Sequence, residues 1–215
     1  EKGWDENKLD MFRRHIIQLG TTGVFVIYDE LEGKEAVTWS YLLHTVELPM
    51  EIQELTDEVK VIGKNKAGGV SVAHLFSSAK TEQAMVDTFF CAPTNWKNVT
   101  NAQGKALKYP NHWHFSSTTV PCKTARFLTV MDTHGKNRPD MQVVRKGNTI
   151  QVGDWTITCN LTEKGKAAIY VSNKTEKVSL NYDAGKKEGA TIVTDQVKGK
   201  QVTKVLIDYL PDFEI

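Results

Sequence analysis

Several features that mark common protein classes are absent from this sequence of 215 residues, or scarce in it. No hydrophobic run approaches the roughly 18–20 apolar residues that a membrane-spanning helix needs. The 27 basic and 26 acidic residues leave a net charge of +1, so no overall field attracts nucleic acid or lipid. We therefore expect neither nucleic acid nor membrane among the partners of the chain.

Cysteine is scarce. Cys91, Cys122 and Cys159 are far apart, and their number is odd. Such a set argues against a disulfide framework and against a thiolate metal site. Because free cysteine is among the most buried residue types, the sequence predicts buried free thiols.

The common catalytic motifs are also missing. The chain contains no G-x-S-x-G nucleophile turn, no H-E-x-x-H zinc motif, no phosphate-binding glycine loop and no dinucleotide fingerprint. These absences exclude most hydrolases, kinases and dehydrogenases. We assign no catalytic residue and expect no cofactor.

The sequence does contain many short apolar runs separated by polar turns, at a spacing of roughly 8–12 residues that is typical of sandwiches and barrels. Gly147 and Gly153 lie in segments typical of turns between antiparallel strands. We predict one all-β domain over residues 1–215, a large antiparallel β-sandwich of two or more layers. A change of composition near 133–140 marks a boundary between sheets or between subdomains. Only residues 79–88 have a local helix preference, which predicts a short helix or a turn there.

Two histidines, His112 and His114, alternate with Trp113 in a predicted strand. Residues i and i+2 of a strand face the same side, so both imidazoles can approach one metal ion, zinc or calcium, with His44 as a third ligand. The alternative is that both are polar residues on the solvent face of that strand. A small complete enzyme centred on these three histidines is a further hypothesis. Asp29 ends one strand and His44 lies in the next, which predicts a structural polar pair.

A long polar loop over residues 93–110 contains the aromatic residues best suited to sugar. Trp96 has Asn95 beside it, and Tyr109 has Asn111 nearby. Aromatic rings stack on sugar faces while amides bind hydroxyl groups, so we predict these four as substrate-binding residues. The alternative is that Trp96 anchors the loop to the core.

Two stretches resemble the β-sandwich of the heparinase II/III-like polysaccharide lyases. The first contains Arg13-Arg14-His15, the strand ending Val26-Ile27-Tyr28-Asp29, the turn Leu31-Glu32-Gly33, and Trp39-Ser40-Tyr41-Leu42-Leu43-His44. The second, from Arg126 to Gly135, is similar to a strand near the end of the family's sheet.

The resemblance implies a bacterial, secreted or periplasmic enzyme in which a helical toroid precedes a β-sandwich. Such enzymes cleave acidic polysaccharides, such as heparin-like glycosaminoglycans or alginate, by β-elimination. The family's catalytic Asn, His and Tyr lie mainly on the toroid, and its His-x-His segment and zinc site come early in the sandwich region. His112 and His114 come too late in the chain to be that segment, so no role is carried over.

The opening residues run from Glu1 into a predicted strand without the pattern of a cleavable signal peptide. We therefore expect a piece of a longer lyase, inactive alone, that supports the cleft and binds acidic polysaccharide beside the toroid. The alternative is a stand-alone secreted carbohydrate-binding or adhesion module.

Overall fold

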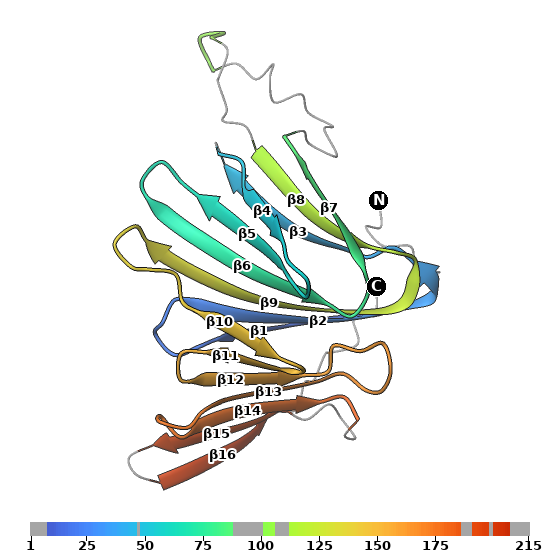
Figure 1. The fold of residues 1–215 in the computed structure, drawn as a ribbon, viewed down its shortest axis with the longest axis vertical. Helices are drawn as coiled ribbons and strands as arrows, with labels where there is room; N and C mark the ends of the chain where they lie inside the picture. Colours follow the sequence, from blue (N-terminus) through green and yellow to red (C-terminus); the bar gives the residue numbers. More distant parts are fainter. Residues whose placement is uncertain are drawn as a thin grey trace.

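The computed structural model describes residues 8–46, 48–87, 101–105, 112–185, 191–197 and 200–206, the last two ranges by their backbone only. Within these residues the chain forms strands and no helix. The strands make three antiparallel sheets that pack on one another in layers (Figure 1). The prediction of an all-β sandwich is confirmed.

The central sheet has six strands in the spatial order β1-β2-β9-β6-β5-β4. Burial alternates residue by residue along β1, as expected for a strand with one buried face. These strands are β1 (Leu9–Gln18), β2 (Val24–Val37), β4 (Glu51–Glu54), β5 (Val59–Lys64), β6 (Gly69–Ser77) and β9 (Cys122–Gly135).

A three-stranded sheet, in the order β3-β8-β7, covers part of one face of the central sheet. It contains β3 (Ser40–Val46), β7 (Thr81–Val86) and β8 (His112–Thr119). The short helix or turn predicted over residues 79–88 is wrong, because β7 occupies most of that segment. Gln83 and Met85 are partly buried while Glu82 and Ala84 are exposed, a period of two. Packing of the inward side chains outweighs the weak local preference for helix.

The seven-stranded sheet covers the other face of the central sheet. Each strand pairs with the next along the chain, from β10 to β16. The turns after β10 and β11 contain Gly147 and Gly153 at positive φ, +61° and +55°, as the turn pattern predicted. The strands are β10 (Val143–Lys146), β11 (Thr149–Val152), β12 (Trp155–Cys159), β13 (Ala168–Asn173), β14 (Val178–Asp183), β15 (Thr191–Val197) and β16 (Lys200–Leu206).

Two hydrophobic cores lie on the two faces of the central sheet. One, against the seven-stranded sheet, includes Tyr28, Phe76, Leu128, Ile157 and Tyr182. The other, against the three-stranded sheet, includes Leu31, Tyr41, Leu75, Phe115 and Phe127. Each large side chain that is fully buried contributes roughly 1.5–3 kcal/mol relative to exposure, so these two interfaces hold the layers together.

Trp39 anchors the corner at which the chain passes between the central and three-stranded sheets. Its backbone nitrogen donates to Thr119 Oγ1 at 3.0 Å, and its indole Nε1 donates to the carbonyl oxygen of Cys122 at 3.1 Å. Because β2 runs into β3 and β8 runs into β9 at this corner, the two hydrogen bonds fix both crossings together.

The composition change near residues 133–140 falls where the chain leaves the central sheet. Strand β9 ends at Gly135, and β10 begins the seven-stranded sheet at Val143. The change in composition therefore coincides with a boundary between two sheets.

Candidate functional site

The four predicted substrate-binding residues Trp96, Asn95, Tyr109 and Asn111 lie outside the described residues. Their role stays a prediction.

The histidine prediction falls on described strands. His44 on β3 is directly opposite His114 on β8, and His112 lies two residues away on the same face. His44 Nε2 and His114 Nδ1 are 3.4 Å apart, and the ring centroids are 4.4 Å apart. Burial lowers the pKa of His114, and His44 and His112 lower it further by charge repulsion. Among the described residues, no group of three or more His, Cys, Asp or Glu side chains is placed to hold a metal ion.

The predicted polar pair between Asp29 and His44 is wrong. Asp29 is buried and accepts two hydrogen bonds from Arg14, at 2.6 Å from Nε and 2.7 Å from NH2. Arg14 is the register partner of Asp29 across β1 and β2. His44 instead projects from the outward face of the three-stranded sheet, where it meets His114.

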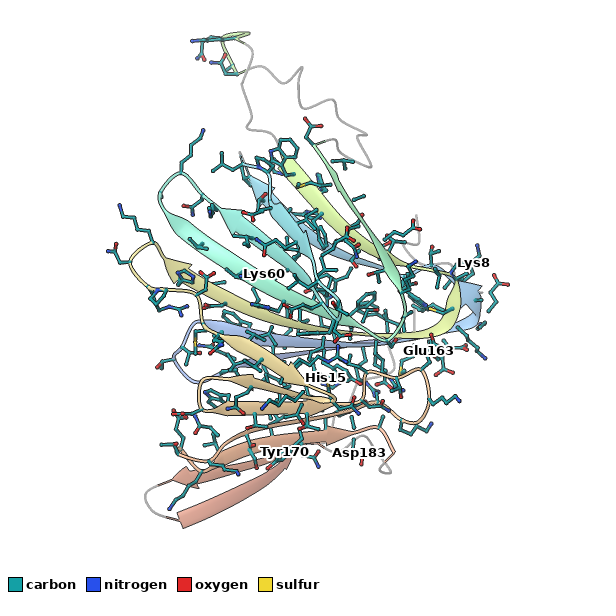
Figure 2. The ribbon with its side chains drawn as sticks, in the orientation of Figure 1. Lys8, His15, Lys60, Glu163, Tyr170 and Asp183 are labelled. Carbon is teal, nitrogen blue, oxygen red and sulfur yellow. The ribbon has the colours of Figure 1, made fainter. Side chains whose placement is uncertain are left out.

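A second polar cluster is buried between the central and seven-stranded sheets. Tyr182 donates a hydrogen bond to Glu30 Oε2 at 3.0 Å and accepts one from Arg13. The ring of His15 lies between these layers, 4.1 Å from that of Tyr182 (Figure 2). Burial and the charge of Glu30 raise the pKa of Tyr182 to about 12. Because Arg13, Tyr182 and Glu30 satisfy one another's polar groups, we interpret the cluster as structural.

A groove opens between the β4–β5 turn and the β6–β7 connection. It has a volume of about 490 Å³, within the usual range for small-ligand sites. Apolar Leu55, Val59 and Leu75 contribute to its walls. Its polar and charged lining consists of Glu54, Thr56, Asp57, Glu58, Ser77, Ser78, Lys80, Thr81, Gln83 and Arg145.

Neighbouring strands hold the polar groups of this groove in place. Arg145 of β10 lies over the ring of Phe76, 5.3 Å from its centroid, and donates to the carbonyl oxygen of Asp57 at 3.1 Å. Gln83 Nε2 donates to Thr81 Oγ1 at 2.8 Å. These hydrogen bonds hold the side chains of Arg145 and Gln83 in fixed positions in the groove.

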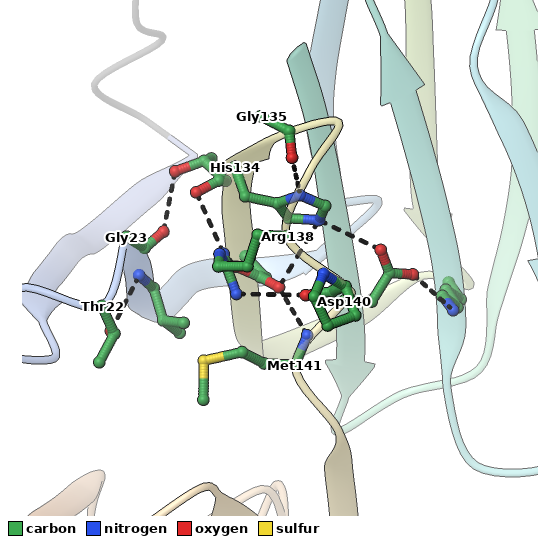
Figure 3. Close-up of polar contacts among 12 residues, drawn as sticks. Thr22, Gly23, His134, Gly135, Arg138, Asp140 and Met141 are labelled. Atoms are coloured by element: carbon green, nitrogen blue, oxygen red, sulfur yellow. Dashed lines mark hydrogen bonds and ion pairs between the residues drawn. The ribbon is translucent and has the colours of Figure 1, made fainter. Parts of the chain in front are cut away.

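A network of charged groups surrounds the end of β9 (Figure 3). Asp132 is buried, pairs with Arg138 and accepts a hydrogen bond from the backbone nitrogen of Met141 at 2.8 Å. His134 Nε2 is 3.1 Å from Asp140 Oδ1, and the other oxygen of Asp140 is 3.8 Å from Lys60 Nζ. Both carboxylates are thus engaged by cations on the protein itself.

The sequence did not identify the groove, because its lining comes from three separated segments, 54–59, 75–83 and Arg145, that only the fold brings together. No local motif marks Lys80, Gln83 or Arg145 as neighbours.

Fold and geometry together define a layered all-β protein with a polar groove at one end of its central sheet. No protein family model matches the chain, and no curated protein matches it. No helix among the described residues is both long and apolar enough to cross a membrane.

Proposed function

We propose that this chain is a non-catalytic β-sandwich domain that binds polysaccharide, as the supporting domain of a lyase acting on uronic acid-containing chains. The observation that carries the proposal is the polar groove between residues 54–59 and 75–83. The resemblance of residues 12–44 to heparinase II/III-like lyases supports the assignment to that class of enzyme.

The lining of the groove suits a polyhydroxylated ligand, because three carboxylates and two cations lie among its neutral polar groups. Carboxylates such as Glu54 accept hydrogen bonds from sugar hydroxyl groups, and the amide of Gln83 both donates and accepts. Lys80 and Arg145 supply positive charge for a uronate carboxylate. Among the described residues, no aromatic side chain lines the groove, so the contacts that those residues offer a ligand are mainly polar.

The edge of the central sheet supports a scaffolding role. Phe12 and Ile16 on β1 are 46% and 65% exposed, on the side of the sheet that the three-stranded sheet covers only in part. They lie on the same face of β1 with Arg14 between them, and exposed apolar side chains on one face can form part of a contact surface. In the proposed enzyme, the helical toroid would pack against this edge.

The test places a large side chain in the groove and leaves the polar side chains of its lining unchanged. Ala79 lines the groove, so Ala79→Trp places a large ring inside it. We expect titration calorimetry with uronic acid oligosaccharides to show at least tenfold weaker binding for this variant. Ala84→Trp is the matched control, because Ala84 is exposed on the other face of β7.

Binding that is equal for the wild type and both variants would show that the groove is not the polysaccharide site. Loss of binding in both variants would assign the effect to a general disturbance of β7. Thermal unfolding of each variant establishes that both are folded.

A further inference from the structure

The chain has five arginines, and Arg145 differs from the other four. Arg13, Arg14 and Arg138 form ion pairs with carboxylates. Arg126 is buried, and its guanidinium donates to two backbone carbonyl oxygens. Arg145 is partly exposed and lines the polar groove. It is therefore the arginine that a ligand in the groove can reach.

Three contacts hold the guanidinium of Arg145 at one end of the central sheet. The group lies over the ring of Phe76, 5.3 Å from its centroid. Its Nε donates to the carbonyl oxygen of Gly147 at 2.9 Å, and its Nη1 donates to the carbonyl oxygen of Asp57 at 3.1 Å. Both acceptors are uncharged, so these contacts orient the guanidinium without neutralising its charge.

The guanidinium keeps donors for a ligand. Arginine has five N–H donors in one plane, and the hydrogen bonds to Gly147 and Asp57 use two of them. In the part of the chain that the structure describes, Nη2 has no hydrogen-bond partner and no carboxylate pairs with Arg145. Glu58, which also lines the groove, pairs instead with His74 at 3.3 Å. Arg145 thus offers a ligand an oriented positive charge.

The other charged groups of the groove limit what the ligand can carry. Glu54, Asp57 and Glu58 line it together with the cations Lys80 and Arg145. Sugar hydroxyl groups donate hydrogen bonds to such carboxylates, whereas sulfate groups are repelled by them. The lining therefore suits a sugar that has hydroxyl groups and a single carboxylate, rather than a densely sulfated chain.

We propose that Arg145 is the residue by which the groove selects sugars that have a carboxylate, namely the unsulfated uronic acid units of a polysaccharide. This inference rests on the proposed function and names the group of the ligand that Arg145 binds. The remaining N–H groups donate charge-assisted hydrogen bonds to the carboxylate oxygens. Because Phe76 and two backbone carbonyls already orient the guanidinium, binding costs it little side-chain freedom.

The experiment compares two ligands that differ only in the carboxylate. One is a uronic acid oligosaccharide, and the other is the same oligosaccharide with each carboxyl group reduced to a primary alcohol. Titration calorimetry with the whole chain measures the affinity for each. We expect the wild type to bind the acidic form at least about tenfold more tightly, because hydrogen bonds to charged groups are stronger than those to neutral groups.

Arg145→Gln should lower the affinity for the acidic oligosaccharide about tenfold and leave the affinity for the reduced one within about twofold. Lys146→Gln is the matched control. It removes the same charge from the next residue of β10, whose exposed side chain lies on the other face of the strand. This control should keep the wild-type preference for the acidic form.

Arg145→Lys is a second variant, for which thermal unfolding again establishes that the protein is folded. It keeps the positive charge and loses the planar set of donors. We expect its preference for the acidic form to be at least about threefold smaller than that of the wild type.

Two outcomes separate this inference from the proposed function. The variant Ala79→Trp should weaken the binding of both oligosaccharides, whereas Arg145→Gln should weaken only that of the acidic one. Equal affinity of the wild type for both ligands would leave the groove as a polysaccharide site and overturn the role of Arg145. A wild type that binds neither ligand would contradict the proposed function and this inference together.

Three further results would overturn the proposal. They are a full preference for the acidic form in a folded Arg145 variant, an equal loss of that preference in Lys146→Gln, and tighter binding of a heparin oligosaccharide than of the unsulfated acidic one of the same length.

Discussion

At the scale of single residues, burial decides which nucleophiles can react. Cys159 is buried in the core beneath the seven-stranded sheet, and burial raises the pKa of its thiol to about 12. The thiolate is the reactive form, so moving the pKa from its ordinary value of 9.0 to about 12 lowers the thiolate fraction about a thousandfold at pH 8. The prediction that this cysteine is a buried free thiol is confirmed.

We predict that native Cys159 resists iodoacetamide at pH 8 and reacts fully in 6 M guanidinium chloride. Cys122, which is free and only partly buried, is the internal comparison and should be labelled much earlier. Peptide mass spectrometry over time measures both rates in one sample. Equal labelling rates for the two cysteines in the native protein would contradict the burial of Cys159.

The hydrogen-bond partner of Asp29 is a second feature at the scale of single residues. The sequence identified it as a buried polar residue but assigned it the wrong partner. The ends of β2 and β3 are close in sequence, yet Asp29 belongs to the central sheet and His44 to the three-stranded sheet. Sequence proximity cannot show which of two sheets a strand joins.

At the scale of elements, the turn between β1 and β2 depends on close contact with β9. Gly23 has φ +79°, and its carbonyl oxygen accepts hydrogen bonds from Thr133 N at 3.0 Å and Thr133 Oγ1 at 2.8 Å. A Cβ on Gly23 would lie 2.6 Å from the carbonyl oxygen of Thr133. Only glycine suits both this backbone conformation and this distance.

We predict that Gly23→Ala destabilises the protein by about 3 kcal/mol or more, because backbone strain and a backbone clash act together. Gly147→Ala is the matched control: Gly147 has φ +61°, but nothing lies within 4 Å of its added Cβ. The free energy of unfolding of that variant should fall by only about 1 kcal/mol. Urea unfolding measures both, and equal losses would show that the contact with Thr133 does not matter.

At the scale of the whole molecule, two buried histidines on different sheets link stability to pH. Burial lowers the pKa of His74, and the positive charge of Lys60 also lowers it. The negative charges of Glu58 and Asp140 raise it, but by less than burial lowers it. Burial also lowers the pKa of His114. Below about pH 6.5, these histidines bind protons more readily in the unfolded chain than in the folded chain. Acidification therefore favours unfolding.

We predict that the free energy of unfolding falls as the pH drops from 7.5 to 5.5. Each histidine that stays neutral in the folded state contributes a slope of up to about 1.4 kcal/mol per pH unit below 6.5. Urea titrations at several pH values measure this slope, and His114→Gln should make it shallower. A stability that is constant or rises on acidification would contradict the prediction.

The sequence by itself determined much, but not all, of the local structure of this protein. Alternation of apolar and polar residues indicated strands in every layer, and Gly147 and Gly153 marked their turns, because these signals depend only on neighbours a few residues apart.

Only the tertiary structure decided which strands join which sheet. It made β7 a strand, paired Asp29 with Arg14 and Gly69 with Gly135, and assembled the groove from three segments. Most of these outcomes depend on contacts with residues tens of positions away along the chain. Such packing energies exceed local preferences and cannot be read from neighbouring residues alone.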